Sequence, residues 1–108
     1  MSATSIRINP NIKTLVNVLT ATPENQPELL KLLEEGTESL ISKRHGWIST
    51  NLLNSPDVGR VIIYSQWETA KDIEAMRQDP AIGKYFQSVA ALAKFESSIC
   101  DVVYVHHA

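Results

Sequence analysis

The sequence has little cysteine and little glycine, and both shortages exclude kinds of chemistry. Its 108 residues include one cysteine and four glycines. Cys100 cannot form a disulfide within the chain, and its place in an apolar run predicts a small buried side chain rather than a redox group. The glycines are scattered, so the chain has no glycine-rich loop of the kind that binds nucleotide phosphates or flavin.

The sequence also lacks a surplus of positive charge and a long apolar run. Its formal net charge is −2 and its pI is near 5.9, and its lysines and arginines are dispersed, which argues against nucleic-acid binding. No run approaches the ~18 apolar residues of a membrane span, and the first residues lack the apolar core of a signal peptide. We therefore expect no contact with nucleic acid or membrane and a cytoplasmic location.

Histidine is scarce, and its placement does not suggest a metal site. There are three histidines: His45 at the predicted end of a helix, and His106 and His107 in the last residues. None has carboxylate or cysteine neighbours at the spacing of metal ligands. We expect His45 to be exposed near the last carbonyl groups of its helix and the other two to lie in a solvated tail. Ser49 and Ser65 likewise lack the histidine and carboxylate partners of a nucleophile.

What the chain does have is the composition of one small globular domain. Hydrophobic residues make up 44% and charged residues 20% of the sequence, and 108 residues leave no room for a second core. Residues 1–11 are polar and end in Asn-Pro-Asn. We predict a flexible N-terminal arm over residues 1–11 and a single domain over residues 12–108.

The most informative segment runs from Val61 to Gln78. Val61 to Trp67 is rich in β-branched and aromatic residues and predicts a strand, and a helix is expected to start within a few residues of its end. A tryptophan at this junction lies at the mouth of the interface between sheet and helix. A small-molecule cavity could open there.

The remaining pattern completes a β-α-β-β-α-β order, which is the order of a ferredoxin-like α+β fold with both helical regions on one face of the sheet. A helix is expected from near Pro27 to Arg44, and a second helical region over residues 70–94, broken at Asp79-Pro80 because the residue before proline disfavours the helical conformation. The predicted strands are Ile12–Ala21, Trp47–Leu53, Arg60–Trp67 and Ile99–Val105.

Both faces of this sheet are predicted to be apolar. Val16 and Val18 alternate with Leu15 and Leu19 along the first strand. Helices cover one face only, and an exposed apolar face of this size is rarely left in water. Two copies that pack sheet to sheet would cover it, so we predict a homodimer.

Three segments in this order resemble the antibiotic biosynthesis monooxygenase family: TLVNVLTATPENQPELLKLLEEGTESL, HGWISTNLL and VIIYSQWETAKDIEAM. The resemblance covers about residues 13–105, and the strand that ends in Tyr-x-Gln-Trp is its best signature. It implies a dimeric α+β barrel. It also implies cofactor-free oxidation of polycyclic aromatic polyketides to quinones, although other members degrade haem and a shared fold does not fix the chemistry.

Asn17 and Trp67 are the predicted catalytic residues. Asn17 lies mid-strand among leucines, where its amide is satisfied by a backbone carbonyl or water, or else serves as a pocket donor to a substrate oxygen. Trp67 is either a core aromatic or a pocket residue whose indole N–H needs a partner. In both cases the resemblance favours the pocket role.

Ile63 marks a departure from the family pattern. Where the polyketide oxygenases often carry a second asparagine, four residues before the tryptophan, this chain has isoleucine. One hydrogen bond to substrate or oxygen intermediate would then be missing. The other predicted substrate-binding residues are Ser65 on the same strand and Met76, Tyr85 and Phe86 on the second helical region, each of which could instead be plain core.

The predicted function is therefore a cofactor-independent monooxygenase that oxidises an electron-rich aromatic of the anthrone or hydroquinone type to a quinone with O2. Two alternatives stay open at this stage. A non-catalytic small-molecule-binding dimer is favoured by Ile63. Haem degradation is disfavoured because residues 70–94 contain no histidine, which is the residue that binds iron in the haem-degrading relatives.

Overall fold

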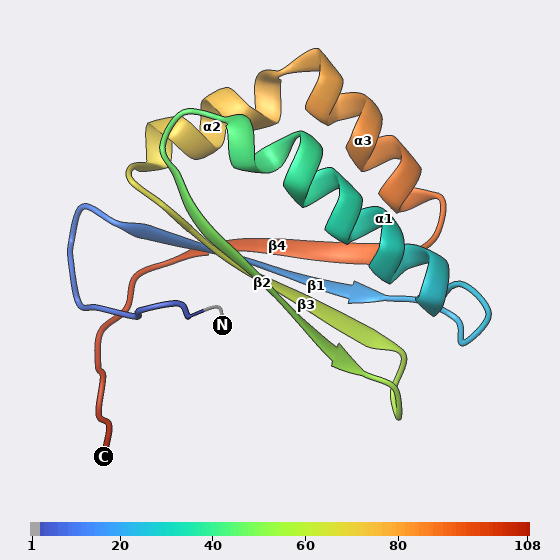
Figure 1. Ribbon diagram of the computed structural model, residues 1–108, viewed down its shortest axis with the longest axis horizontal. Helices are drawn as coiled ribbons and strands as arrows, with labels where there is room; N and C mark the ends of the chain where they lie inside the picture. Colours follow the sequence, from blue (N-terminus) through green and yellow to red (C-terminus); the bar gives the residue numbers. More distant parts are fainter. Residues whose placement is uncertain (1–2) are drawn as a thin grey trace.

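Strands β1 (Lys13–Thr20) and β3 (Arg60–Trp67) form the centre of an antiparallel sheet with the order β2–β3–β1–β4. Strand β2 (Trp47–Ser55) and strand β4 (Lys94–Cys100) form its two edges. The computed structural model describes residues 3–108, and its helices all lie on the same side of the sheet (Figure 1). The predicted ferredoxin-like α+β order is confirmed.

Helix α1 (Gln26–Ser39) is followed by the short 3-10 helix η1 (Ile41–Lys43), and α2 (Ala70–Gln78) by α3 (Pro80–Ala90). The predicted break at Asp79-Pro80 is confirmed. Asp79 accepts a hydrogen bond from the backbone N–H of Ala81 and caps α3, whose first residue is proline. Thr69 caps α2 in the same way by accepting from the N–H of Asp72.

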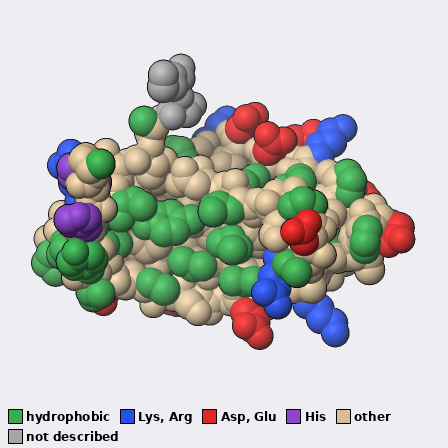
Figure 2. Space-filling view, turned by 90° about the horizontal axis from the view of Figure 1, so that it is seen from below, with side chains coloured by type: hydrophobic (Ala, Val, Ile, Leu, Met, Phe, Trp, Pro, Cys, Tyr) green, Lys and Arg blue, Asp and Glu red, His purple; other side chains and the backbone are tan. Residues whose placement is uncertain are grey.

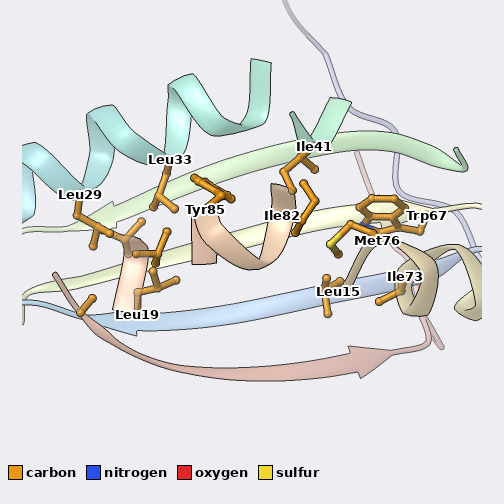
Figure 3. Packing of buried hydrophobic residues seen from close by; sticks show 13 residues of the cluster. Leu15, Leu19, Leu29, Leu33, Ile41, Trp67, Ile73, Met76, Ile82 and Tyr85 are labelled. Atoms are coloured by element: carbon orange, nitrogen blue, oxygen red, sulfur yellow. The ribbon is translucent and has the colours of Figure 1, made fainter. Parts of the chain in front are cut away.

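Strand register decides which side chains face the helices. Asn17 of β1 lies opposite Ile63 of β3 on one side and Ser97 of β4 on the other. Leu15 and Leu19, two residues before and after Asn17, are buried on the same face. Figure 3 shows how the leucines of β1 and α1 pack with Trp67 and the apolar residues of α2 and α3 in one core.

Strand β4 lies earlier in the chain than the sequence predicted. It spans Lys94–Cys100, not Ile99–Val105, and its pairing with β1 ends where Thr14 lies opposite Cys100. Beyond that pair, β1 has ended and the apolar residues that follow have no strand to pair with. Cys100 is exposed, so the expected buried side chain is also wrong. Edge strands tolerate polar sequences such as KFESSIC, and the apolar run after it misled the prediction.

The N-terminal segment lies under the open face of the sheet (Figure 1). Thr4 donates a hydrogen bond to Asn51, and Gln66 donates one to the carbonyl of Ser5. Met1 and Ser2, the first residues of the predicted flexible arm, lie outside the described residues. Among residues 3–108, no helix has both the length and the apolar character needed to cross a membrane.

Candidate active site

A cavity of about 270 Å³ lies between the sheet and the helices, next to β4. Apolar side chains form most of its wall, including the predicted residues Met76 and Phe86. Asn17, Ser97 and Arg77 supply its polar groups. Phe95, which is 42% exposed, and the partly exposed Arg77 lie at its mouth. The cavity is close to the lower end of the ~300–1,000 Å³ usual for ligand pockets, and its few polar groups on an apolar wall are typical of them.

The amide of Asn17 is the most unusual group in this cavity. It is half-buried, and its side chain forms no hydrogen bond with any residue of the described chain. Within residues 3–108 the buried side-chain polar atom without a partner is Thr14 Oγ1, so the Asn17 amide keeps open space beside it in the cavity. The amide is therefore available to a ligand.

Trp67 is fully buried, and its indole N–H already has an acceptor. Trp67 Nε1 donates to Ser65 Oγ over 3.1 Å, and Ser65 Oγ lies 3.3 Å from the carbonyl oxygen of Leu15, to which it donates. This short chain of hydrogen bonds satisfies the buried indole, as expected for a tryptophan in a core. A ligand could receive the N–H only by displacing Ser65.

A second, inner hollow of about 30 Å³ adjoins the cavity. The two share Leu15, Asn17, Met76 and Phe86 in their walls. Six of the seven predicted site residues line the inner hollow: Asn17, Ile63, Ser65, Trp67, Met76 and Phe86. The structure thus places the predicted amide and the predicted indole around the same hollow.

Tyr85 is the predicted site residue that lines neither hollow. Its ring packs against α1 at Gly36, where an added Cβ would lie 2.2 Å from Tyr85 Cε1. Figure 3 shows the ring between Leu33 and Ile82, and burial raises the pKa of its hydroxyl to about 12. Tyr85 is therefore a packing residue that brings α3 close to α1.

Sequence reasoning missed Arg77, Ser97 and Phe95. Arg77 of α2 donates a hydrogen bond to Ser97 Oγ of β4 over 3.0 Å and reaches Glu74 at 3.5 Å. Ser97 would have been found from the correct position of β4, because it pairs directly with Asn17. Nothing in the sequence marks Arg77, apart from its place directly after Met76.

The titratable groups with shifted pKa values lie elsewhere. His45 is exposed, as predicted, but its Nδ1 lies 2.8 Å from a carboxylate oxygen of Asp72 rather than against helix carbonyls. The hydrogen bond to Asp72 raises the pKa of His45, and the hydrogen bonds from His45 and Thr69 lower the pKa of Asp72. This pair joins the start of β2 to α2 outside both hollows.

Neither hollow has a histidine or a carboxylate in its wall, as far as residues 3–108 show. Within that range there is also no cluster of three His, Cys, Asp or Glu side chains placed to hold a metal ion. The donor set is therefore amide, hydroxyl and guanidinium. Such groups donate hydrogen bonds to oxygen atoms, and the guanidinium stabilises negative charge.

Comparison with known proteins identifies the family of the chain. Residues 13–88 match the antibiotic biosynthesis monooxygenase family. The chain is 33% identical over 100 residues to the tetracenomycin-F1 monooxygenase of Streptomyces glaucescens, covering 93% of this chain and 89% of that protein. The chain belongs to this family and is a monooxygenase by class.

Two solved structures have the same fold. A monooxygenase from the gene ActVA-Orf6 of Streptomyces coelicolor, in complex with nanaomycin D, matches with a TM-score of 0.81 and 19% identity over 93% of this chain and 96% of that one. SnoaB from Streptomyces nogalater, described as a cofactor-independent oxygenase, matches with a TM-score of 0.74 and 15% identity over 88% and 96%. At these identities the likeness shows the fold alone.

Proposed function

We propose that this chain is a cofactor-independent monooxygenase that oxidises an electron-rich aromatic, of the anthrone or hydroquinone type, to a quinone with O2. The observation that carries the proposal is the amide of Asn17, which has no hydrogen-bond partner among the described residues and lies in a largely apolar cavity. The substrate classes of the family relatives support the same reading. Tetracenomycin F1 and nanaomycin D, named with two of the relatives, point to an aromatic polyketide.

The reaction balances without an added reductant when the substrate carries an acidic CH2 group next to the aromatic rings. Loss of one proton gives a carbanion whose charge spreads onto the enolate oxygen. The carbanion carbon supplies an electron pair to O2, a C–O bond forms, and the resulting peroxide takes a proton. Its O–O bond then breaks as the second C–H proton leaves, so that CH2 and O2 become C=O and water.

The cavity offers what this sequence of steps needs. The Asn17 amide would donate to the enolate oxygen, and the positive charge of Arg77 at the mouth would stabilise the anion. The apolar walls exclude water, which strengthens both interactions. No carboxylate or imidazole in the described residues lines the cavity, so the substrate is expected to give its first proton to solvent water at the mouth, before it reaches the apolar interior.

Turnover of an anthrone tests the proposal. The protein is mixed with the anthrone under argon, air or 18O2 is admitted, and the quinone is followed by absorbance and mass spectrometry. We expect faster quinone formation than in protein-free buffer, with one 18O atom in the new carbonyl group. Equal rates with and without protein, across several anthrones and hydroquinones, would contradict the proposal.

The pH dependence offers a second test of the same chemistry. If the substrate loses its proton to water, kcat/KM should rise with pH and follow the pKa of the substrate itself. Substrates of different pKa should then give different profiles. A common inflection for all substrates would instead indicate a protein base and would contradict this part of the mechanism.

We also propose that the protein works as a homodimer. Val16, Val18, Ile62, Tyr64 and Leu53 share the face of the sheet that the helices do not cover. Figure 2 shows the hydrophobic side chains gathered along the middle of this open face. A second copy would cover them. The cytoplasmic location expected from the sequence remains a prediction.

One alternative keeps support from the structure, namely a small-molecule-binding protein without turnover. Ile63 offers no hydrogen bond, and the N–H of Trp67 is already taken by Ser65. Tight anaerobic binding of an anthrone together with no quinone on addition of air would favour this alternative. Haem degradation gains no support, because no histidine of residues 3–108 lines either hollow.

A further inference from the structure

The inner hollow is too small for a whole aromatic ring. Its volume is about 30 Å³, whereas one water needs ~10–15 Å³ on this measure. The hollow therefore has room for a diatomic molecule or about two waters. It lies directly beside the 270 Å³ cavity, and Asn17 belongs to the walls of both.

Each of the three hydroxyl groups around the hollow forms at least one hydrogen bond within the protein, and only that of Ser65 both donates and accepts. Ser65 Oγ accepts from Trp67 and donates to the Leu15 carbonyl. Thr37 Oγ1 donates to the carbonyl of Leu33 over 2.7 Å.

The fourth polar wall residue besides Asn17, Ser65 and Thr37 is Thr50, whose Oγ1 accepts a hydrogen bond from Trp47 Nε1 over 2.8 Å. A buried water typically makes about three hydrogen bonds. A water here could use the Asn17 amide, the lone pairs of Thr37 Oγ1 and the O–H of Thr50. The other six wall residues are apolar and include Ile41, Ile63 and Phe86, so a small apolar molecule would contact carbon over most of the wall and would compete with water for the hollow.

The hollow also has a second side, away from the cavity. It shares Thr37 and Thr50 with an open groove between α1 and β2, which is lined further by Glu34, Glu38 and Leu52. The mouth of the cavity lies at β4, the opposite edge of the sheet. The hollow therefore adjoins the cavity on one side and the groove on the other, toward opposite edges of the sheet.

We propose that the inner hollow binds dioxygen, which reaches it between Thr37 and Thr50, while the aromatic substrate enters the cavity beside Arg77. This rests on the proposed monooxygenase function. Dioxygen held there lies on the inner side of the substrate, next to Asn17 and against the side chain of Ile63. An isoleucine at this position then contributes to an apolar pocket for O2, whereas an asparagine would offer polar groups to water.

Xenon provides a test that does not depend on turnover, because it binds in small dry apolar cavities. Crystals of the wild-type protein are pressurised with xenon. We expect one xenon atom within the wall formed by Ile63, Trp67 and Phe86. Ordered water in that position, or no xenon in it, would overturn the proposal even if the enzyme proves to be a monooxygenase.

Filling the hollow tests its role in the reaction. In Ile63→Phe the larger ring should exclude xenon and raise KM for O2 at least fivefold, and KM for O2 should rise by a larger factor than the anaerobic Kd for the anthrone. Val58→Phe, which adds the same ring at an exposed turn position, should leave all three quantities as in the wild type. Loss of xenon from Ile63→Phe with an unchanged KM for O2 would overturn the proposal.

The xenon experiment and the anthrone turnover experiment together separate the proposed dioxygen site from the proposed monooxygenase function. If no anthrone is oxidised but xenon occupies the hollow, the monooxygenase reaction fails while a site for small apolar molecules stands. If quinone forms but xenon is absent from the wild-type hollow, the dioxygen site fails alone. Ile41→Phe, which fills the same hollow from η1, replaces Ile63→Phe should that variant not fold.

Discussion

Each face of the sheet has one feature that departs from the usual placement of polar and apolar groups. The face under the helices contains an amide, Asn17, that has no hydrogen-bond partner among the described residues, while the open face presents Leu53 with 51% of its side chain exposed. A polar group is usually placed in water and an apolar one beneath helices. This difference is the basis of both proposals, a ligand on the covered face and a second copy of the chain on the open face.

The largest expected effect is a loss of stability when the packing of the covered face is disrupted. Trp67→Ala removes a fully buried indole and leaves Ser65 without its donor, so the free energy of unfolding should fall by about 3–5 kcal/mol. Urea denaturation measures the change. Val58→Ala, at an exposed position, should alter it by less than about 0.5 kcal/mol. A similar small change for both variants would show that Trp67 is not part of the core.

The next largest effect is a loss of activity without a loss of stability. It is tested by comparing two asparagines on opposite faces of the sheet. Asn17→Ala should lower kcat/KM about 100-fold, as expected on losing one donor to a developing oxyanion, without lowering the melting temperature. Asn51 is the matched control, because it donates to the carbonyl of Tyr64 and accepts from Thr4 on the open face. Asn51→Ala should cost about 1 kcal/mol of stability and keep its activity. The reverse pattern would assign Asn17 to structure.

A charged substitution on the open face tests whether two copies of the chain associate through it. Leu53→Lys should weaken self-association at least tenfold without unfolding the chain, because the side chain is half exposed in one copy and would be buried between two. Sedimentation equilibrium or light scattering over a micromolar range measures the effect. Val58→Lys is the control at the turn after β2. A wild-type protein that is already monomeric at these concentrations would remove the proposed dimer.

The smallest effect concerns the His45–Asp72 pair, which lies outside both hollows. A raised pKa for His45 means that its contribution to stability is present below its ordinary value of 6.5 and is lost as pH rises through the folded-state pKa. A lowered pKa for Asp72 means that its contribution is present above 3.8 and is lost as pH falls through its folded-state pKa.

His45→Gln should therefore lower the melting temperature slightly between pH 3.8 and 6.5 and have less effect at alkaline pH. Both groups are exposed to solvent, so added salt should reduce the difference. His107→Gln, in the exposed tail, should show no such dependence. An equal loss at every pH would show that the ion pair contributes nothing.

Much of the fold could be predicted because the decisive signals are local. The strand Arg60–Trp67 was predicted with the bounds that the structure has, since its β-branched residues end at Trp67 and a capped helix follows. The helix break at Asp79-Pro80 follows from the chemistry of proline alone. The alternation along β1 likewise placed Asn17 on the face of Leu15 and Leu19.

The candidate site could be predicted only where its residues lie on those well-marked elements. Asn17, Ile63, Ser65 and Trp67 belong to β1 and β3 and line the inner hollow. Tyr85 shares α3 with Phe86, but the packing of its ring against Gly36 turns it away from both hollows. Adjacent residues of a helix point in different directions, and the sequence pattern of α3 does not show which of the two faces the hollows.

The sequence alone determined the order of the elements, the faces of the two central strands and the amide among leucines, because each depends on neighbours a few positions away. Only the tertiary structure decided the position of β4, the exposure of Cys100 and the meeting of Arg77 with Ser97 beside Asn17. These depend on register between segments some 80 residues apart in the case of β1 and β4. Register is set by the pairing and packing of the whole sheet, which no local pattern encodes.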